Sequence, residues 1–156
     1  MYVRNKSALT MFSILALSLC LSWSTVGAQP LQEKSLYQRL GGYDAIAAVV
    51  DDFIGRLVSD KRFEKFFSGF STDSKKKIRQ HLVDQLCAAA GGPCVYMGRD
   101  MKTTHTGLGI TEDDWNAGVK HLGESLDKYK VPAKEKSDVL SVVGTLKKDI
   151  VEKWFD

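Results

Sequence analysis

The apolar residues of this 156-residue chain recur mainly at intervals of three and four. That spacing places side chains on one face of an α-helix. No stretch alternates apolar and polar residues with the period of two that a half-buried β-strand requires. The sequence therefore predicts an all-α fold with about four substantial helices.

Glycine, proline and capping residues predict where these helices begin and end. The first follows Gly41-Gly42 and fades near Asp60, with a stripe formed by Ile46, Val49, Val50, Phe53, Ile54 and Leu57. After an aromatic stretch that closes at Gly69, the second opens around Ser71 to Ser74 and carries Ile78, Leu82, Val83, Leu86 and Cys87 as far as Gly91-Gly92-Pro93. The third begins at Thr111, with Asp114 in a capping-box position, and has the stripe Trp115, Val119, Leu122, Leu126 and Tyr129. The fourth starts at Pro132 and runs through Val139, Leu140, Val142, Val143, Leu146 and Ile150 to Trp154.

The N-terminal segment has a different character. Arg4 and Lys6 precede an uncharged stretch from Ser7 to Gln32, and the small residues Val26-Gly27-Ala28 follow its apolar part. This layout is typical of a secretory signal peptide cut after Ala28, so we expect residues 1–28 to be removed and residues 29–156 to form one domain exported to the periplasm or outside the cell. The alternative is an N-terminal membrane anchor. Cys20 does not indicate a lipoprotein, because the bulky Leu19 precedes it.

The charge balance offers little information about partners. Removing Arg4 and Lys6 from the 22 basic residues leaves 20 against 19 acidic ones. The densest basic run is Lys75-Lys76-Lys77, which is too short to indicate a nucleic-acid surface. We therefore expect no nucleic-acid partner, and a membrane partner only if the N-terminal segment stays uncleaved.

Cys87 and Cys94 are the cysteines of the expected mature domain. In an oxidising compartment they can form a disulfide across Gly91-Gly92-Pro93, whereas two buried free thiols are the alternative. Their spacing is not that of a zinc or redox motif.

The three histidines differ in their surroundings. His121 groups with Gly118 and Ser125 at helical spacing, so we expect it to be solvated. His81 falls at the edge of an apolar stripe, from which it can point inward or reach water, with a nearby carboxylate as the ordinary partner. His105 lies four residues after Met101, and on a short helix the two share a face. A binding site in a small all-α domain lies between helices, and the irregular segment from Cys94 to Gly109 is the natural place for it.

Several strings resemble group I truncated haemoglobins. They are Leu36-Tyr37-Gln38-Arg39-Leu40-Gly41-Gly42, Phe66-Phe67-Ser68-Gly69 and the block from Gly91-Gly92-Pro93-Cys94 through Tyr96, Gly98 and Met101 to His105. The resemblance extends from about Ser35 to Val151. It implies a two-over-two helical sandwich around haem b (iron protoporphyrin IX), with His105 as the proximal iron ligand. It also implies that the haem slot is lined by Phe53, Phe67, Leu82, Leu86, Tyr96 and Met101, and that Lys102 and Arg99 pair with the propionates.

The residues expected on the face of the haem opposite His105 depart from the family's best-known pattern. Ile54 and Leu82 stand where relatives place a tyrosine and a glutamine that donate hydrogen bonds to bound oxygen. His81 lies ten residues before Gly91, where some members place a second iron-binding histidine. We therefore expect His81 either to coordinate the iron or to donate a hydrogen bond to the ligand.

The resemblance implies binding of a diatomic gas, namely oxygen, nitric oxide or carbon monoxide. The enzymatic version of that function is redox activity or detoxification of nitric oxide. The protein would then act as a nitric oxide dioxygenase or a peroxidase-like enzyme with an unidentified reductant. A bis-histidine electron-transfer protein is one alternative. A helical interaction domain without a cofactor is an alternative of a different class.

Overall fold

A computed structural model of the chain describes residues 33–152. The predicted signal segment and Trp154 lie outside these residues. The described part contains eight helices: α1 (Leu36–Arg39), α2 (Tyr43–Ser59), α3 (Glu64–Phe67), α4 (Thr72–Ala89), α5 (Met101–His105), α6 (Glu112–Lys128), α7 (Ala133–Gly144) and α8 (Lys147–Ile150). None of the helices in this part is long and apolar enough to cross a bilayer. The prediction of an all-α fold with four substantial helices is confirmed by α2, α4, α6 and α7.

Glycine or capping side chains mark where three of the long helices begin, and in α4 and α6 a side chain accepts a hydrogen bond from an amide of the first turn. Gly42 precedes α2 with a φ of 84°, a left-handed conformation that glycine adopts without steric cost. The hydroxyl of Ser71 accepts a hydrogen bond from the Ser74 amide at the start of α4. Thr111 and Asp114 form the predicted capping box at the start of α6.

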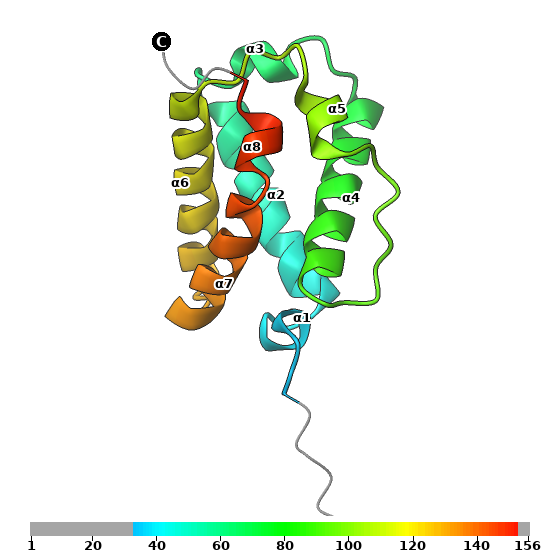
Figure 1. Cartoon of the computed structure of the whole chain (residues 1–156), viewed down its shortest axis with the longest axis vertical. Coiled ribbons are helices and arrows are strands. Elements are labelled where there is room, and N and C mark those ends of the chain that lie inside the picture. Colours follow the sequence, from blue (N-terminus) through cyan, green and yellow to red (C-terminus); the bar gives the residue numbers. More distant parts are fainter. Residues whose placement is uncertain (1–32, 153–156) are drawn as a thin grey trace, which may run out of the picture. The chain divides into compact units, whose positions relative to one another are not determined.

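Helix α2 is the centre of the domain, packed against α4 on one face and α6 on another (Figure 1). Two apolar clusters result. One joins α2 to α4 through Ile46, Ala47, Val50, Val83 and Cys87. The other joins α2 to α6 and α7 through Val49, Leu122, Leu126 and Val139. Val50 and Val83, both in the first cluster, are completely buried, so the contact between α2 and α4 is a closely packed part of the core.

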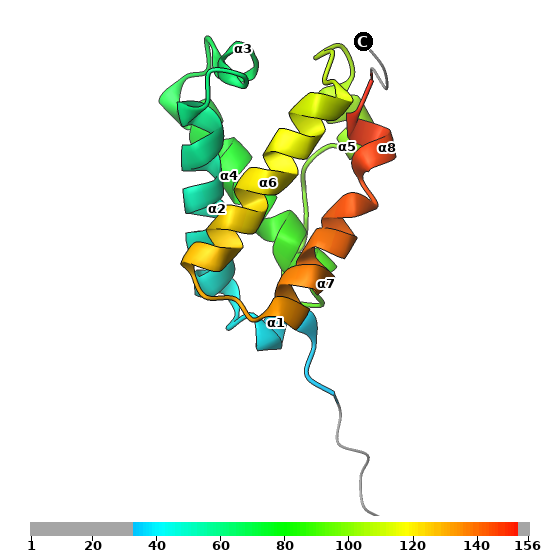
Figure 2. The ribbon, with the colours of Figure 1, turned by 90° about the vertical axis from the view of Figure 1, so that its left-hand side faces the viewer.

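The predicted continuous fourth helix is wrong, because it divides into α7 and α8. The amides of Thr145 and Leu146 bond to carbonyls only three residues back, at 3.2 Å and 2.9 Å, and so form a tight turn. Gly144 has low helix propensity, and the Thr145 hydroxyl donates to the Val142 carbonyl at 2.7 Å. After this turn α8 packs against α5, as Figure 2 shows.

A polar network lies between α2 and α6. Asp52 accepts hydrogen bonds from Arg56 Nε at 2.7 Å, from the Ser125 hydroxyl at 2.8 Å and from the Lys128 ammonium group. The Lys128 and Arg56 donors hold the pKa of the Asp52 carboxyl well below its ordinary value. Ser125 is completely buried, so the Asp52 carboxylate also satisfies a hydroxyl inside the core.

Candidate functional site

His105 is the last residue of the five-residue helix α5. So short a helix is not stable by itself and depends on its surroundings. Asp100 caps its first turn, since the carboxylate accepts hydrogen bonds from the Thr103 amide at 2.8 Å and from the Thr103 hydroxyl at 2.7 Å. These bonds also lower the pKa of Asp100, with the Thr103 hydroxyl as the largest cause. Met101 begins the helix and lies on the same face as His105, as the spacing predicts.

The His105 ring is half-buried, and its Nδ1 lies 2.8 Å from the Met101 carbonyl oxygen. A carbonyl oxygen only accepts, so Nδ1 must carry the proton and donate it. In the neutral imidazole this leaves Nε2 with a lone pair, which is the arrangement that metal-binding imidazoles use. The residues present at α5 therefore fit an axial ligand to haem iron.

The segment between α4 and α5 is attached to α4 by a disulfide between Cys87 and Cys94, whose Cα atoms are 5.8 Å apart. The alternative of two free thiols is therefore wrong. Gly92 passes so close to this bond that a Cβ there would lie 2.7 Å from Cys87 Sγ and 2.5 Å from Tyr37 Cδ2. The backbone approaches α4 this closely only because residue 92 is a glycine.

His81 is exposed on α4, and its ring packs edge-on against Tyr96 with the centroids 5.9 Å apart. The Tyr96 hydroxyl donates a hydrogen bond to the Arg99 carbonyl at 2.6 Å, which fixes this ring within its loop. Burial is the largest of the causes that raise the pKa of Tyr96. The partner of His81 is thus an aromatic ring, and not the carboxylate that its position on the helix suggested.

The other predicted pocket residues lie in separate environments. Leu82, Leu86 and Ile54 pack against the cluster that contains Val50 and Val83. Phe53 packs against the second cluster, and Phe67 makes an edge-on contact with Phe70 at 6.4 Å between ring centroids. Arg99, just before α5, and Lys102, within α5, are both exposed to solvent.

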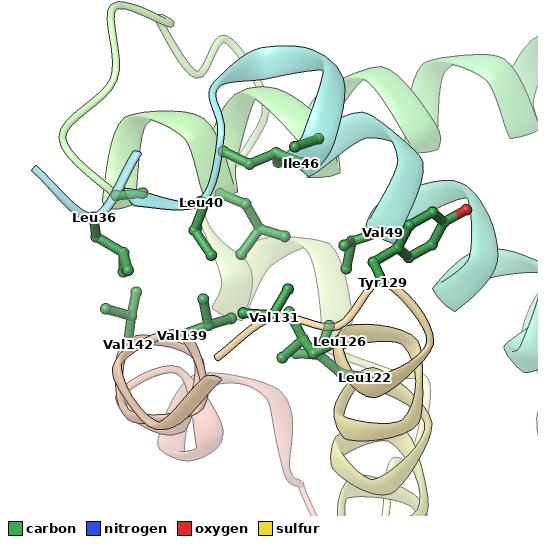
Figure 3. A pocket seen from close by; sticks show the side chains of 13 residues that line it. Leu36, Leu40, Ile46, Val49, Leu122, Leu126, Tyr129, Val131, Val139 and Val142 are labelled. Carbon is green, nitrogen blue, oxygen red and sulfur yellow. The ribbon is translucent and has the colours of Figure 1, made fainter. Parts of the chain in front are cut away.

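The structure also contains an apolar cavity that the sequence did not predict (Figure 3). It has a volume of about 140 Å³ and is lined by Leu36, Leu40, Ala45, Ile46, Val49, Leu86, Ala90, Leu122, Leu126, Tyr129, Val131, Val139 and Val142. Leu86 is the one predicted site residue in this lining, and no lining residue comes from α5. The cavity is therefore distinct from the surroundings of His105.

The prediction of a solvated His121 is wrong. Its ring is half-buried, Nε2 lies 2.9 Å from an Asp60 carboxylate oxygen, and Nδ1 is buried 3.8 Å from Glu124 Oε2. Asp60 follows the end of α2, and the ring of Phe63 covers the histidine edge-on at 5.9 Å between centroids. The hydrogen bond from His121 is the largest cause of the lowered pKa of Asp60. Helical spacing missed Asp60 and Phe63 because they come from a different part of the chain.

Comparison with known proteins agrees with this arrangement. A family model of bacterial-like globins matches residues 35–152. The group 1 truncated hemoglobin GlbN of a Nostoc species is 37% identical over 119 residues, which are 76% of this chain and 98% of that protein. The protein of the same description from Mycolicibacterium paratuberculosis is 33% identical over 116 residues, or 74% of this chain and 83% of that protein.

Solved structures lead to the same family. The truncated hemoglobin of Tetrahymena pyriformis in its Fe(III) form superimposes with a TM-score of 0.70 at 27% identity, covering 77% of this chain and 100% of that one. The 2/2 hemoglobin of Synechococcus sp. PCC 7002, solved in the cyanomet state with covalently attached heme, has a TM-score of 0.70 at 28% identity and the same coverage. These similarities confirm the predicted truncated-globin fold. The chain belongs to the bacterial-like globin family and is a haem-binding group 1 truncated haemoglobin.

Proposed function

We propose that this protein holds haem b through His105 Nε2 and binds a diatomic gas on the opposite face of the haem. The hydrogen bond from His105 Nδ1 to the Met101 carbonyl carries this proposal, because it selects the tautomer that an iron ligand needs. Bound haem supplies an iron with a coordination position open to a gas. Membership of the globin family implies binding of diatomic ligands in general. Haem as the cofactor also sets aside the interaction domain without a cofactor.

The nature of the gas follows from the side chains at the predicted distal positions. Ile54 and Leu82 pack against an apolar cluster and offer no hydrogen-bond donor. Bound oxygen acquires partial negative charge and gains stability from donors, whereas nitric oxide and carbon monoxide depend on them less. The proposal is therefore a site that favours nitric oxide or carbon monoxide over reversible oxygen carriage. In its enzymatic form, dioxygen would oxidise nitric oxide to nitrate, and an unidentified reductant would return the resulting ferric haem to the ferrous state.

His81 is the polar side chain proposed to influence this ligand. Its edge-on contact with Tyr96 supports an open sixth position in preference to a bis-histidine electron-transfer site. A hydrogen bond from this imidazole to the ligand would require a different side-chain rotamer and loss of the contact with Tyr96. The open-site proposal predicts a high-spin ferric spectrum for the unmodified protein.

Absorption spectra of the ferric and ferrous protein, recorded after haem is supplied, test the proposal. His105→Ala should abolish tight haem binding, whereas His121→Ala is the matched control, because its ring contacts Asp60 and Phe63 and should leave the Soret band intact. A Soret band that survives His105→Ala unchanged would contradict the assignment of the ligand. A low-spin ferric spectrum that becomes high-spin in His81→Ala would instead establish ligation by both histidines. Stopped-flow mixing of the oxygenated protein with nitric oxide tests the enzymatic form, which predicts rapid formation of nitrate.

The proposed place of action is outside the cytoplasm, after removal of residues 1–28. The disulfide between Cys87 and Cys94 supports this location, since such bonds persist in oxidising compartments. Mass spectrometry of the protein recovered from its native host should find a mature chain that begins near Gln29. A full-length chain recovered from the membrane would support the anchored alternative, and a full-length chain from the cytosol would refute export.

A further inference from the structure

The C-terminal end of the described chain forms hydrogen bonds with the turn that follows His105. The Glu152 carboxylate accepts hydrogen bonds from the Gly107 amide through Oε1 and from the Gly109 amide through Oε2, the latter at 2.6 Å. The Glu152 amide in turn donates to the Ile110 carbonyl at 3.0 Å. Three hydrogen bonds thus connect one residue near the C-terminus to three of the five residues that follow α5.

The two glycines make this contact geometrically feasible. Gly107 and Gly109 have φ values of +86° and +63°, in the left-handed region that favours glycine. Backbone amides that turn toward a common point in such a segment form a concave site for an anion. Here the anion is the chain's own carboxylate, and hydrogen bonds to a charged acceptor are stronger than neutral ones.

The carboxylate comes from a well-anchored part of the backbone. Val151, the preceding residue, is only 4% exposed, and α8 packs against α5. The five-residue helix α5 is therefore held at both ends, by the Asp100 side chain before it and by Glu152 after it. The hydrogen bond from His105 Nδ1 to the Met101 carbonyl orients the ring relative to α5, and the two end contacts hold this short helix, which is not stable by itself, in place.

We propose that Glu152 is a positioning residue for His105, which fixes the end of α5 and so the direction from which Nε2 approaches the haem iron. This inference rests on the proposed function, in which His105 is the iron ligand. Loss of the carboxylate should let the end of α5 fray. The imidazole then samples a wider range of orientations, and the haem escapes more readily.

Glu152→Gln tests the proposal at nearly constant side-chain volume. An amide NH₂ group cannot accept a hydrogen bond, so one of the two glycine amides loses its partner. Glu112→Gln is the matched control, because Glu112 Oε1 accepts from Lys147 Nζ at 2.5 Å and so connects α6 to α8 without contacting the Gly107 turn. A second variant, Gly107→Ala, disturbs the same site without a change of charge, since its backbone favours glycine while its Cβ would meet nothing within 4 Å.

The measurements are the rate of haem transfer to excess apomyoglobin and the iron–histidine stretching band of the ferrous protein in resonance Raman spectra. Glu152→Gln and Gly107→Ala should lose haem about tenfold faster than the unmodified protein, equivalent to about 1.4 kcal/mol. Their stretching band should broaden or shift, while Glu112→Gln should match the unmodified protein in both respects. Circular dichroism of the haem-free variants establishes that each remains folded.

The outcomes separate this inference from the function on which it rests. If the unmodified protein bound haem through His105 but Glu152→Gln had an unchanged stretching band, the positioning role would be wrong and the proposed function would stand. Equal acceleration of haem loss in Glu152→Gln and Glu112→Gln would likewise overturn it, by showing a general loss of stability. Failure of the unmodified protein to bind haem would refute both.

Discussion

Reduction of the disulfide between Cys87 and Cys94 should weaken the fold by an amount that follows from its position. The two cysteines are separated by seven residues in sequence, and closing a loop of that size removes entropy from the unfolded chain worth about 2.4 kcal/mol at 25 °C. Cys87 is completely buried, but reduction leaves both sulfur atoms in place and creates no large cavity. The expected effect is therefore mainly the entropic one, and the free energy of unfolding should fall by about 2 kcal/mol.

Urea denaturation of the haem-free protein, with and without a dithiol reductant, measures this change. For a domain of this size the midpoint should move down by about 1–2 M, given the slopes usual for small proteins in urea. Titration of two thiols in the unfolded sample establishes that the bond was broken. Cys87→Ala/Cys94→Ala is the control, since its midpoint should not respond to the reductant. An unchanged midpoint in a sample with both thiols free would refute the argument from loop entropy.

Two further predictions concern packing and charge. Asp52→Asn should lower the free energy of unfolding by about 1–2 kcal/mol at neutral pH. Because Lys128 and Arg56 depress the pKa of Asp52, the stability that Asp52 contributes is present above the unfolded-state pKa near 3.8 and is lost as the pH falls below it. The difference in free energy of unfolding between the variant and the unmodified protein should therefore shrink when urea titrations are repeated from pH 7 to pH 3. A difference that stayed constant would contradict this. Gly92→Ala should destabilise the protein by about 1–3 kcal/mol, because its Cβ would overlap Cys87 and Tyr37. Gly55→Ala, in open space on α2, should instead stabilise the protein by about 0.5–1 kcal/mol. Thermal unfolding that ranked the two variants in the opposite order would refute the packing argument.

The parts of the fold that sequence predicted are those that local patterns determine. Helix α2 begins after Gly41-Gly42 and ends at Ser59, as its apolar spacing and the preceding glycines indicated. The capping box of Thr111 and Asp114 lies within four residues, so the sequence predicted it as well. His105 lies at the end of a short helix with Met101 on the same face, as the spacing indicated, and its role as the iron ligand stays a prediction from the resemblance.

The parts that sequence missed depend on contacts between distant segments. The partner of His121 is Asp60, which is 61 residues away in the chain, and no helical spacing could reveal it. The same holds for Glu152, whose contacts with Gly107 and Gly109 span more than 40 residues. The sequence indicated that these glycines interrupt helical structure, but it did not indicate that one carboxylate binds both of their amides. The direction of the His81 ring likewise depends on Tyr96, which a loop brings back along α4.

The apolar cavity between α1, α2, α4, α6 and α7 has a consequence for the volume of the protein. Its walls offer almost no hydrogen-bond partners, and water therefore gains little by entering it. Unfolding would eliminate the part of this space that water does not fill, and the decrease in volume on unfolding scales with that part. Hydrostatic pressure should therefore favour the unfolded chain more strongly than in a domain of equal length whose core is filled.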